Sequence, residues 1–201
     1  MKPHNNHQIC TIGHSNHTWE RFLELLGAGR IEVVVDIRSS PYSRYSPHFN
    51  KNVLEDSLRR VGIKYVFLGN MLGGRPEGEV FYDDKGHVYY DQIEKSSSFK
   101  EGINRLLTGL KTYKLAVLCG EEDPALCHRR LLIGRVLSKY GVEVMHIRGD
   151  GRLQSEEELT TEEDYQKHKG QMSLFAVQET EEWKSIPSVS PKKARRNSLK
   201  P

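Results

Sequence analysis

The sequence predicts a single three-layer α/β domain with a mostly parallel sheet, crossover helices and a long glycine-rich loop, followed by an extended C-terminal arm. Short apolar runs alternate with stretches of helical spacing, an order typical of parallel strands joined by helices on both faces. The runs at 33–37 and 115–118 are apolar without alternation, as in strands that are buried on both sides. The 201 residues are enough for one hydrophobic core.

Five strands and four main helices are expected. Apolar and β-branched residues predict strands at 8–12, 32–37, 64–68, 114–119 and 142–147. Apolar residues three to four positions apart predict helices at 18–28, 52–61, 99–110 and 123–140. Thr18 is a suitable N-cap for the first helix, and Asp123 followed by Pro124 suits the start of the fourth. The stretch 69–92 is too long for a simple connector and is expected to be a functional loop.

Composition places the domain boundary near residue 150. Residues 8–149 are expected to form the domain, and 150–201 a polar, partly disordered arm. Residues 150–164 carry seven acids and one Arg, and the chain ends in a segment rich in Ser, Pro, Lys and Arg. Such segments rarely bury enough apolar surface to fold alone.

The net charge of +3 is unevenly distributed. Five of the 30 Lys and Arg residues lie in the tail at 192–200, which leaves 25 basic residues against 27 acidic ones elsewhere. This balance excludes a uniformly basic DNA-binding fold. The tail itself is either a solvated end or a phosphate contact for nucleic acid.

The composition also indicates the compartment. The longest apolar runs are far shorter than the roughly 18 residues of a membrane helix, and the first ten residues lack the apolar run of a signal peptide. Three cysteines argue against a secreted disulfide scaffold. We therefore expect a cytoplasmic protein without a membrane partner, and the sequence leaves its oligomeric state open.

Unusual polar residues gather where the predicted strands end. The carboxyl ends of parallel strands line the crevice in which ligands bind, so these residues are expected to share one functional crevice. Alternatively, Asp36 and Arg38 form a structural ion pair and His146 is a core histidine. The residues at the strand ends are His14, Ser15, Asp36, Arg38, Cys119, Glu121 and His146.

Each candidate has an expected role. Asp36 or Glu121 would act as general base or nucleophile, and His14 or His146 as proton donor. Arg38 and Arg129 would hold a phosphate or stabilise negative charge. The expected catalytic residues are His14, Asp36, Glu121, Cys127 and His146. The expected substrate contacts are Ser15, Arg38, Ser43, Gly73, Gly74, Cys119, His128 and Arg129.

Cys127, His128 and Arg129 are expected in the first turn of the fourth helix. The helix dipole and free amides there favour a thiolate or a bound phosphate, which makes Cys127 a candidate nucleophile. In the alternative, Cys127 is a small packing residue and Arg129 pairs with a nearby acid. A tyrosine-phosphatase loop is excluded, because Ile133 and Ala125 stand six residues after Cys127 and Cys119, where that loop needs Arg.

We expect no metal site and no required cofactor. The spacing of Cys119 and Cys127 is not that of a zinc knuckle, and neither CxxC nor HExxH occurs. A divalent metal held by Asp36 and Glu121 remains an alternative. The turn Leu72-Gly73-Gly74-Arg75 lacks the Lys-Ser/Thr of a P-loop and is expected to close over the crevice, or to be a surface turn.

Taken in order, the motifs resemble the family catalogued as domain of unknown function 488. The resemblance runs from about residue 9 to 147 and implies an α/β fold with a shared site, but no reaction. The motifs are Thr11-Ile12-Gly13-His14-Ser15, Asp36-Ile37-Arg38 with Pro41 and Ser43, Leu72-Gly73-Gly74, Cys119 with Glu121, Cys127-His128-Arg129, and His146-Ile147.

A second resemblance lies in the arm. Gln171, Met172, Ser173, Leu174 and Phe175 are similar to the short peptide by which bacterial replication and repair proteins dock on the sliding clamp. Two adjacent apolar side chains would fill a pocket and the Gln would anchor the entry. The alternative is a segment that packs back on the domain, since Phe175, Val177 and Trp183 are apolar too.

Three functions are therefore carried forward. The leading expectation is an enzyme of hydrolytic or glycosyl-transfer type that acts on DNA or a nucleotide-derived group. The clamp peptide and basic tail would recruit it, which implies DNA repair or DNA metabolism. One alternative is a small-molecule enzyme with a Cys127 or Cys119 thiolate and no DNA role. The other is a non-catalytic binding module.

Overall fold

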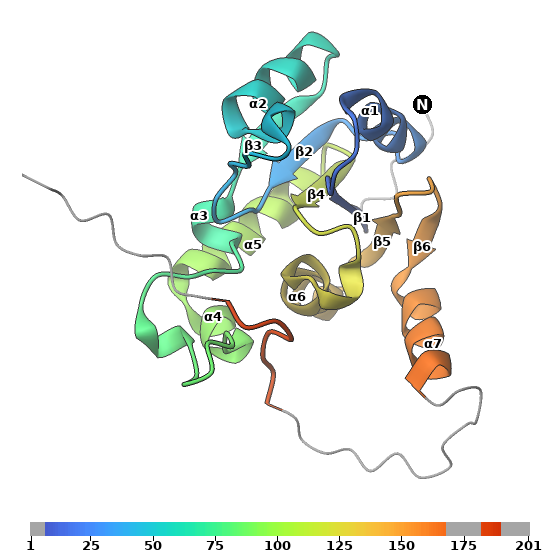
Figure 1. Ribbon diagram of the computed structural model, residues 1–201. Helices are drawn as coiled ribbons and strands as arrows, with labels where there is room; N and C mark the ends of the chain where they lie inside the picture. Colours follow the sequence, from blue (N-terminus) through green and yellow to red (C-terminus); the bar gives the residue numbers. More distant parts are fainter. Residues whose placement is uncertain (1–6, 168–181, 190–201) are drawn as a thin grey trace, which may run out of the picture.

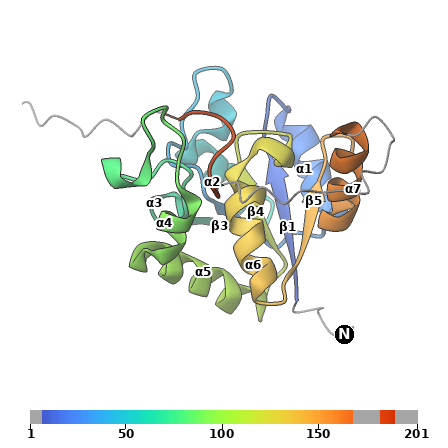
Figure 2. The same cartoon turned by 90° about the horizontal axis from the view of Figure 1, so that it is seen from below.

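Residues 7–167 and 182–189 are described by a computed structural model, in which helices cover both faces of a six-stranded sheet (Figures 1 and 2). The strand order is β3-β2-β4-β1-β5-β6, and only β6 runs antiparallel to its neighbour. This confirms the predicted α/β class. The strands are β1 (Gln8–Gly13), β2 (Val33–Asp36), β3 (Lys64–Phe67), β4 (Leu115–Cys119), β5 (Glu143–Ile147) and β6 (Leu153–Ser155).

Two helices cover one face of the sheet, α1 (Trp19–Ala28) and α2 (Lys51–Arg60). Both lie on the same side in Figure 1. The hydroxyl of Thr18 accepts the backbone N–H of Arg21 at 3.2 Å, so the predicted N-cap is present. Phe22 of α1 and Leu58 of α2 are fully buried in the core on this face of the sheet.

The other face packs against α3 (Gly69–Leu72), α4 (Tyr90–Lys95), α5 (Ser97–Leu110) and α6 (Arg135–Lys139). The stretch 69–92, expected as one loop, therefore contains α3, a short 3-10 turn at Glu79–Phe81 and the start of α4. These elements are too short to show a helical period in the sequence.

The fourth predicted helix, at 123–140, is broken into three pieces. A 3-10 turn spans Pro124–Leu126, a π-helical turn spans Arg129–Gly134, and α6 completes the segment. Cys127 lies between the first two pieces with extended backbone, φ −108° and ψ 138°. The prediction of one continuous helix from residue 123 was wrong: helical backbone begins at His128, and Cys127, whose carbonyl accepts the N–H of Leu131 at 3.0 Å, lies directly before its first turn.

The sheet continues beyond the expected boundary at residue 149. β6 pairs with β5, and α7 (Glu156–Lys167) follows it. Arg130 holds this helix through ion pairs of 2.6 Å to Glu156 and 2.8 Å to Glu163, and Leu159 is buried. Two of the acids that predicted a solvated arm, Glu156 and Glu163, are thus paired with an arginine of the domain.

Residues 182–189 also return to the domain. Tyr89 forms an antiparallel bridge with Lys184, and Trp183 Nε1 donates to the carbonyl of Leu131 at 2.8 Å. This segment, red in Figures 1 and 2, lies between α4 and α6. The clamp-like peptide at 171–175 and the basic tail at 192–200 lie outside the described residues.

No helix in the described part of the chain is long and apolar enough to cross a membrane.

Candidate functional site

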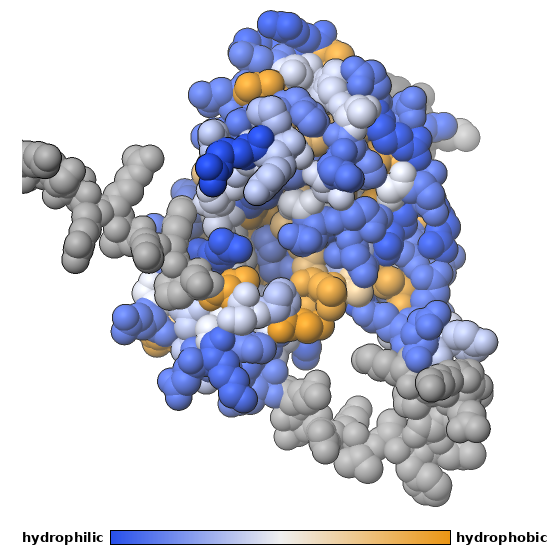
Figure 3. Space-filling model, in the orientation of Figure 1, coloured by the Kyte–Doolittle hydropathy of each residue, from blue (hydrophilic) through white to orange (hydrophobic). Residues whose placement is uncertain are grey.

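A cavity of about 600 Å³ opens at the carboxyl edge of the sheet. Its walls come from the segments after β1, β2 and β4, from the turn after α3, and from residues 185–189. The surface in Figure 3 is hollowed near the centre of the view, with apolar residues along the edge of the hollow. The expected site residues that line the cavity are His14, Arg38, Ser43, Gly74, Cys119, Glu121, Cys127 and His128.

The segment after β1 is held against the segment after β4. His14 N donates to Cys119 O at 3.0 Å, and Ser15 N donates to Gly120 O at 2.8 Å. A Cβ on Gly13 would lie 1.8 Å from the carbonyl oxygen of Glu121, so only glycine allows this approach. Ser15, with φ +44°, turns the chain there but does not line the cavity.

His14 is a neutral imidazole in the cavity wall. Burial, together with the nearby Arg38 guanidinium, lowers its pKa to about 4. Nδ1 lies 2.8 Å from the carbonyl oxygen of Ser15, so the neutral ring carries its proton on Nδ1 and leaves Nε2 as an acceptor. The ring stacks on Phe49 with centroids 4.5 Å apart.

Asp36 and Arg38 form the structural ion pair that was one of the two expectations. Arg38 Nη2 and Nε lie 2.6 and 2.9 Å from the two carboxylate oxygens, and Tyr65 Oη donates to Asp36 Oδ2 at 2.7 Å. Asp36 is completely buried and does not line the cavity. With these partners its oxygens are not free for a substrate or for a metal shared with Glu121.

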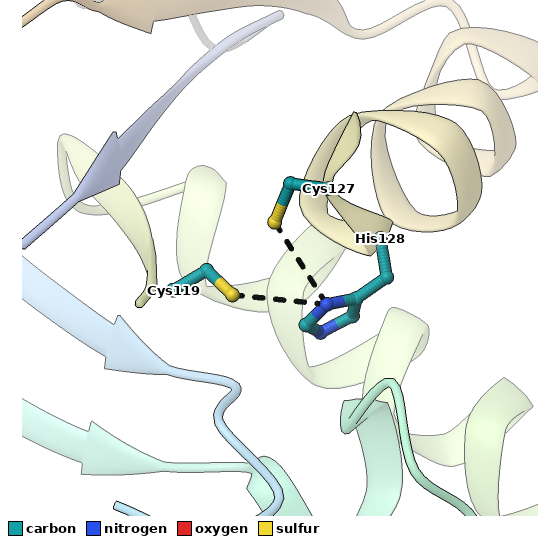
Figure 4. A group of neighbouring side chains, drawn as sticks. All are labelled: Cys119, Cys127 and His128. Carbon is teal, nitrogen blue, oxygen red and sulfur yellow. Dashed lines mark hydrogen bonds between the residues drawn. The ribbon is translucent and has the colours of Figure 1, made fainter. Parts of the chain in front are cut away.

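Two sulfurs and one imidazole converge in the cavity wall (Figure 4). His128 Nδ1 lies 3.7 Å from Cys119 Sγ and 3.9 Å from Cys127 Sγ. The donor atoms of the three residues lie within 4.8 Å of one another, close enough to hold a metal ion.

The two thiols differ in acidity. The hydrogen bond from Cys127 lowers the pKa of Cys119 to about 7, helped by the Arg129 charge and the amides of Glu121 and Gly120. The same hydrogen bond, together with burial, raises the pKa of Cys127. Cys119 is therefore the more acidic thiol of the pair, whereas the sequence led us to expect Cys127 to be the activated one.

Arg129 acts within the protein rather than in the cavity. It is fully buried, and its guanidinium donates to the carbonyls of Glu121 and Glu122. The contact fixes the segment between Cys119 and Cys127. Arg129 does not line the cavity, so it does not hold a ligand there.

His146 is a core histidine. It is completely buried, with Nδ1 2.8 Å from Thr11 Oγ1 and Nε2 3.0 Å from Glu156 Oε2, and burial lowers its pKa. It joins β1, β5 and α7 at a distance from the cavity lining.

The glycine turn supports His128. A Cβ on Gly74 would lie 2.8 Å from the His128 ring, and one on Gly73 would lie 2.3 Å from Ser39 Oγ. Ser39 Oγ accepts the N–H of Arg75 at 2.9 Å, while Ser43 Oγ accepts two backbone N–H groups of its own loop. The turn thus packs beside the imidazole and completes one wall.

Sequence reasoning missed the wall formed by Ser185, Pro187, Ser188 and Val189. Ser185 is 5% exposed and accepts the N–H of Val88 at 2.9 Å. The available signal was Trp183, a large apolar residue in an otherwise polar segment.

These features define an α/β protein with a cysteine–histidine cluster at the carboxyl edge of its sheet. The family model described as Domain of unknown function DUF488 matches residues 18–136, more than half of the chain. The chain belongs to the DUF488 family. The match does not include the motifs at 11–15 and 146–147. No curated protein and no solved structure shows a significant match.

Proposed function

We propose that the chain is a small-molecule enzyme in which the Cys119 thiolate is the nucleophile and His128 its proton partner. The observation that carries the proposal is the position of Cys119 Sγ, 3.7 Å from His128 Nδ1 in the wall of the cavity. A thiol beside an imidazole is the arrangement that activates cysteine nucleophiles. Of the three functions expected from the sequence, the thiolate enzyme fits this geometry best.

A packing role does not explain the histidine. His128 Nε2 is buried without a hydrogen-bond partner among the described residues, and its Nδ1 faces two sulfurs. Leaving a buried polar atom unpaired costs about 1–3 kcal/mol. An apolar side chain would pack here without that cost, so the imidazole indicates chemistry.

The chemistry follows from the positions of the protons. His128 Nδ1 takes the proton of Cys119, whose lone pair attacks an electrophilic carbon of the substrate. The new S–C bond replaces the bond to the leaving group, which departs with its electron pair and takes the proton from His128. Water, or an acceptor that carries a proton, then attacks the same carbon and gives that proton to His128 Nδ1, while the S–C bond breaks and Cys119 leaves as the thiolate. Cys127 donates its hydrogen bond to Cys119 throughout.

The cavity suits a small polar molecule that carries negative charge. Arg75 and the Asp36-paired Arg38 line it, with the neutral His14 ring and several serine hydroxyls as hydrogen-bonding groups, while Glu121 is the acid in the lining. A volume of about 600 Å³ is typical of ligand pockets and accommodates a nucleotide-sized group. The expected base Asp36 is enclosed, which weighs against the two-carboxylate mechanism on DNA.

Labelling with iodoacetamide at neutral pH, mapped by mass spectrometry, tests the nucleophile. Cys119 should label fastest, because burial raises the pKa of Cys10 to about 11 and the hydrogen-bonded Cys127 keeps its proton. His128→Ala should slow the labelling of Cys119, whereas Cys10→Ser should not. Equal and slow labelling of all three cysteines would refute the proposal.

A further inference from the structure

We propose that Cys119, Cys127 and His128 bind Zn²⁺ or a similar soft divalent cation, with a fourth coordination position directed to the cavity. A bound cation would withdraw electron density from the Cys119 sulfur and so lower its nucleophilicity. Only this consequence, that the metal switches the reaction off, rests on the proposed function.

The three donor atoms already stand near the corners of a tetrahedral site. Bonds of about 2.3 Å to sulfur and about 2.0–2.1 Å to nitrogen place two sulfurs about 3.8 Å apart, and sulfur and nitrogen about 3.6 Å apart. The two sulfur–nitrogen separations are 3.7 and 3.9 Å, and all three donors lie within 4.8 Å of one another. The sulfur–nitrogen separations exceed the tetrahedral value by about 0.1 and 0.3 Å, and the two sulfurs, which lie within 4.8 Å of each other, would have to approach by about 1 Å at most.

The donor set selects the class of cation. Thiolate and imidazole ligands suit zinc and similar metals, whereas magnesium and calcium prefer oxygen. A coordinating thiol loses its proton, so two thiolates would balance the charge of a divalent cation. The complex would then be neutral, which suits the buried positions of Cys119 and Cys127.

The surrounding contacts hold the donors in place. Cys119 ends β4, while Cys127 and His128 precede the π-helical turn. Arg129 ties the two segments together through the carbonyls of Glu121 and Glu122, and Gly74 packs against the His128 ring. Little ordering entropy would be lost on binding.

The site has the character of an exchangeable rather than a structural site. Three protein ligands leave one position for water or substrate, as in catalytic zinc sites. The second ring nitrogen of a metal-bound histidine usually donates to a carboxylate or carbonyl, and His128 Nε2 has no such partner among the described residues. We therefore expect a cation that chelators remove without unfolding the protein.

Cobalt titration of the full chain tests the site. The chelator-treated protein, kept reduced with a phosphine, is titrated with Co²⁺. One equivalent should produce thiolate-to-cobalt charge transfer in the near ultraviolet and the visible bands of tetrahedral cobalt, and Zn²⁺ should remove both. Cys119→Ser and Cys127→Ser should each weaken binding at least roughly 100-fold, the upper range for losing a second-shell partner. The matched control Cys10→Ser should bind as the wild type does.

A wild-type measurement covers the case in which a variant fails to fold. One equivalent of Zn²⁺ should protect Cys119 from iodoacetamide, while leaving the slow labelling of Cys10 unaffected. Absence of the cobalt bands would overturn the inference, and so would labelling of Cys119 that is fast in the metal-free protein and unchanged by Zn²⁺.

The two proposals fail in different ways. Fast labelling of Cys119 without cobalt bands would refute the metal site and support Cys119 as the nucleophile. Cobalt bands with slow labelling of the metal-free protein would support the metal site and refute Cys119 as the nucleophile.

Discussion

The negative charge of Asp36 is neutralised within the protein by an ion pair. Its carboxylate receives the Arg38 side chain, the Arg38 backbone N–H and the Tyr65 hydroxyl, while Arg38 also donates to the carbonyl of Phe49 at 2.9 Å. Asp36 is therefore a positioning residue that holds Arg38 in the cavity wall. Its link to function is indirect, through the side chain it orients.

Asp36→Asn should destabilise the protein strongly. The change removes the negative partner and leaves the Arg38 charge buried, which typically costs about 3–5 kcal/mol. Urea denaturation measures the loss. Asp56→Asn is the matched control, because Asp56 pairs with Arg59 on the surface and should change stability by less than about 1 kcal/mol. Equal effects of the two variants would contradict the buried ion pair.

His14 should make the protein sensitive to mild acid. Its pKa of about 4 in the folded protein lies below the ordinary 6.5, so the unfolded chain takes up a proton first as the pH falls. The neutral His14 ring therefore adds to the free energy of unfolding, and this stabilisation is fully present above pH 6.5. It is lost as the pH falls from 6.5 to about 4, to a total on the order of 3 kcal/mol. His146, whose pKa is also lowered, acts in the same direction.

Thermal unfolding across this pH range checks the expectation. The Tm of the wild type should fall from pH 7 to pH 4.5, and His14→Gln should fall less steeply. Parallel curves would show that His14 does not titrate as its surroundings imply.

At the scale of elements, the local sequence pattern predicted the strands and helices whose side chains simply alternate between core and solvent or lie wholly in the core. The strands around 33–37 and 115–118 and the capped helix at 18–28 occur within one or two residues of their predicted bounds. The prediction of a continuous fourth helix failed because the π-helical turn there accompanies a tertiary contact, in which the buried Arg129 side chain donates to two backbone carbonyls. A local pattern does not contain such a contact.

The same distinction applies to the site. Strand-end reasoning grouped His14, Arg38 and Cys119, which line one cavity. It could not place Asp36 and His146 outside the cavity, because their partners Tyr65 and Glu156 lie on other elements, 29 and 10 residues away in the chain. The cavity wall at 185–189 was missed for the same reason.

Trp183 should anchor residues 182–189. Its ring lies beneath Arg135 and Lys139, 4.6 and 5.1 Å from the centroid, and packs edge-on against Tyr90. Trp183→Ala should lower the free energy of unfolding by about 2 kcal/mol, less than the loss of a fully buried aromatic side chain. The Tyr90 amide, which donates to the carbonyl of Trp183, should then exchange faster. Hydrogen exchange measures this. Tyr45→Ala, at a side chain that is 96% exposed, is the control and should change neither quantity.

At the scale of the whole molecule, family membership and fold are established, whereas recruitment to DNA remains a prediction. It depends on the peptide at 171–175 and on the basic residues at 192–200. The described lining of the cavity and these two segments are made up of different residues, so each is tested with its own variants.

Calorimetry with a bacterial sliding clamp tests the peptide. The full chain should bind with a Kd of tens of micromolar or tighter, about −6 kcal/mol, as expected for a short linear peptide. Leu174→Ala combined with Phe175→Ala should remove several kcal/mol, because two adjacent apolar anchors would be lost. Absence of wild-type binding would refute docking, and equal binding of both proteins would place the contact elsewhere.

The strand order has a consequence for biosynthesis. β1 lies between β4 and β5, so Cys10 pairs with Ala116 and Met145 and has no strand partner near it in the chain. During translation β2 and β3 can pair early, but β1 must wait until more than half of the chain has left the ribosome. Such distant pairings slow folding and prolong the exposure of apolar strands. The central strand of the sheet, which delivers His14 to the cavity, is thus among the last to be enclosed.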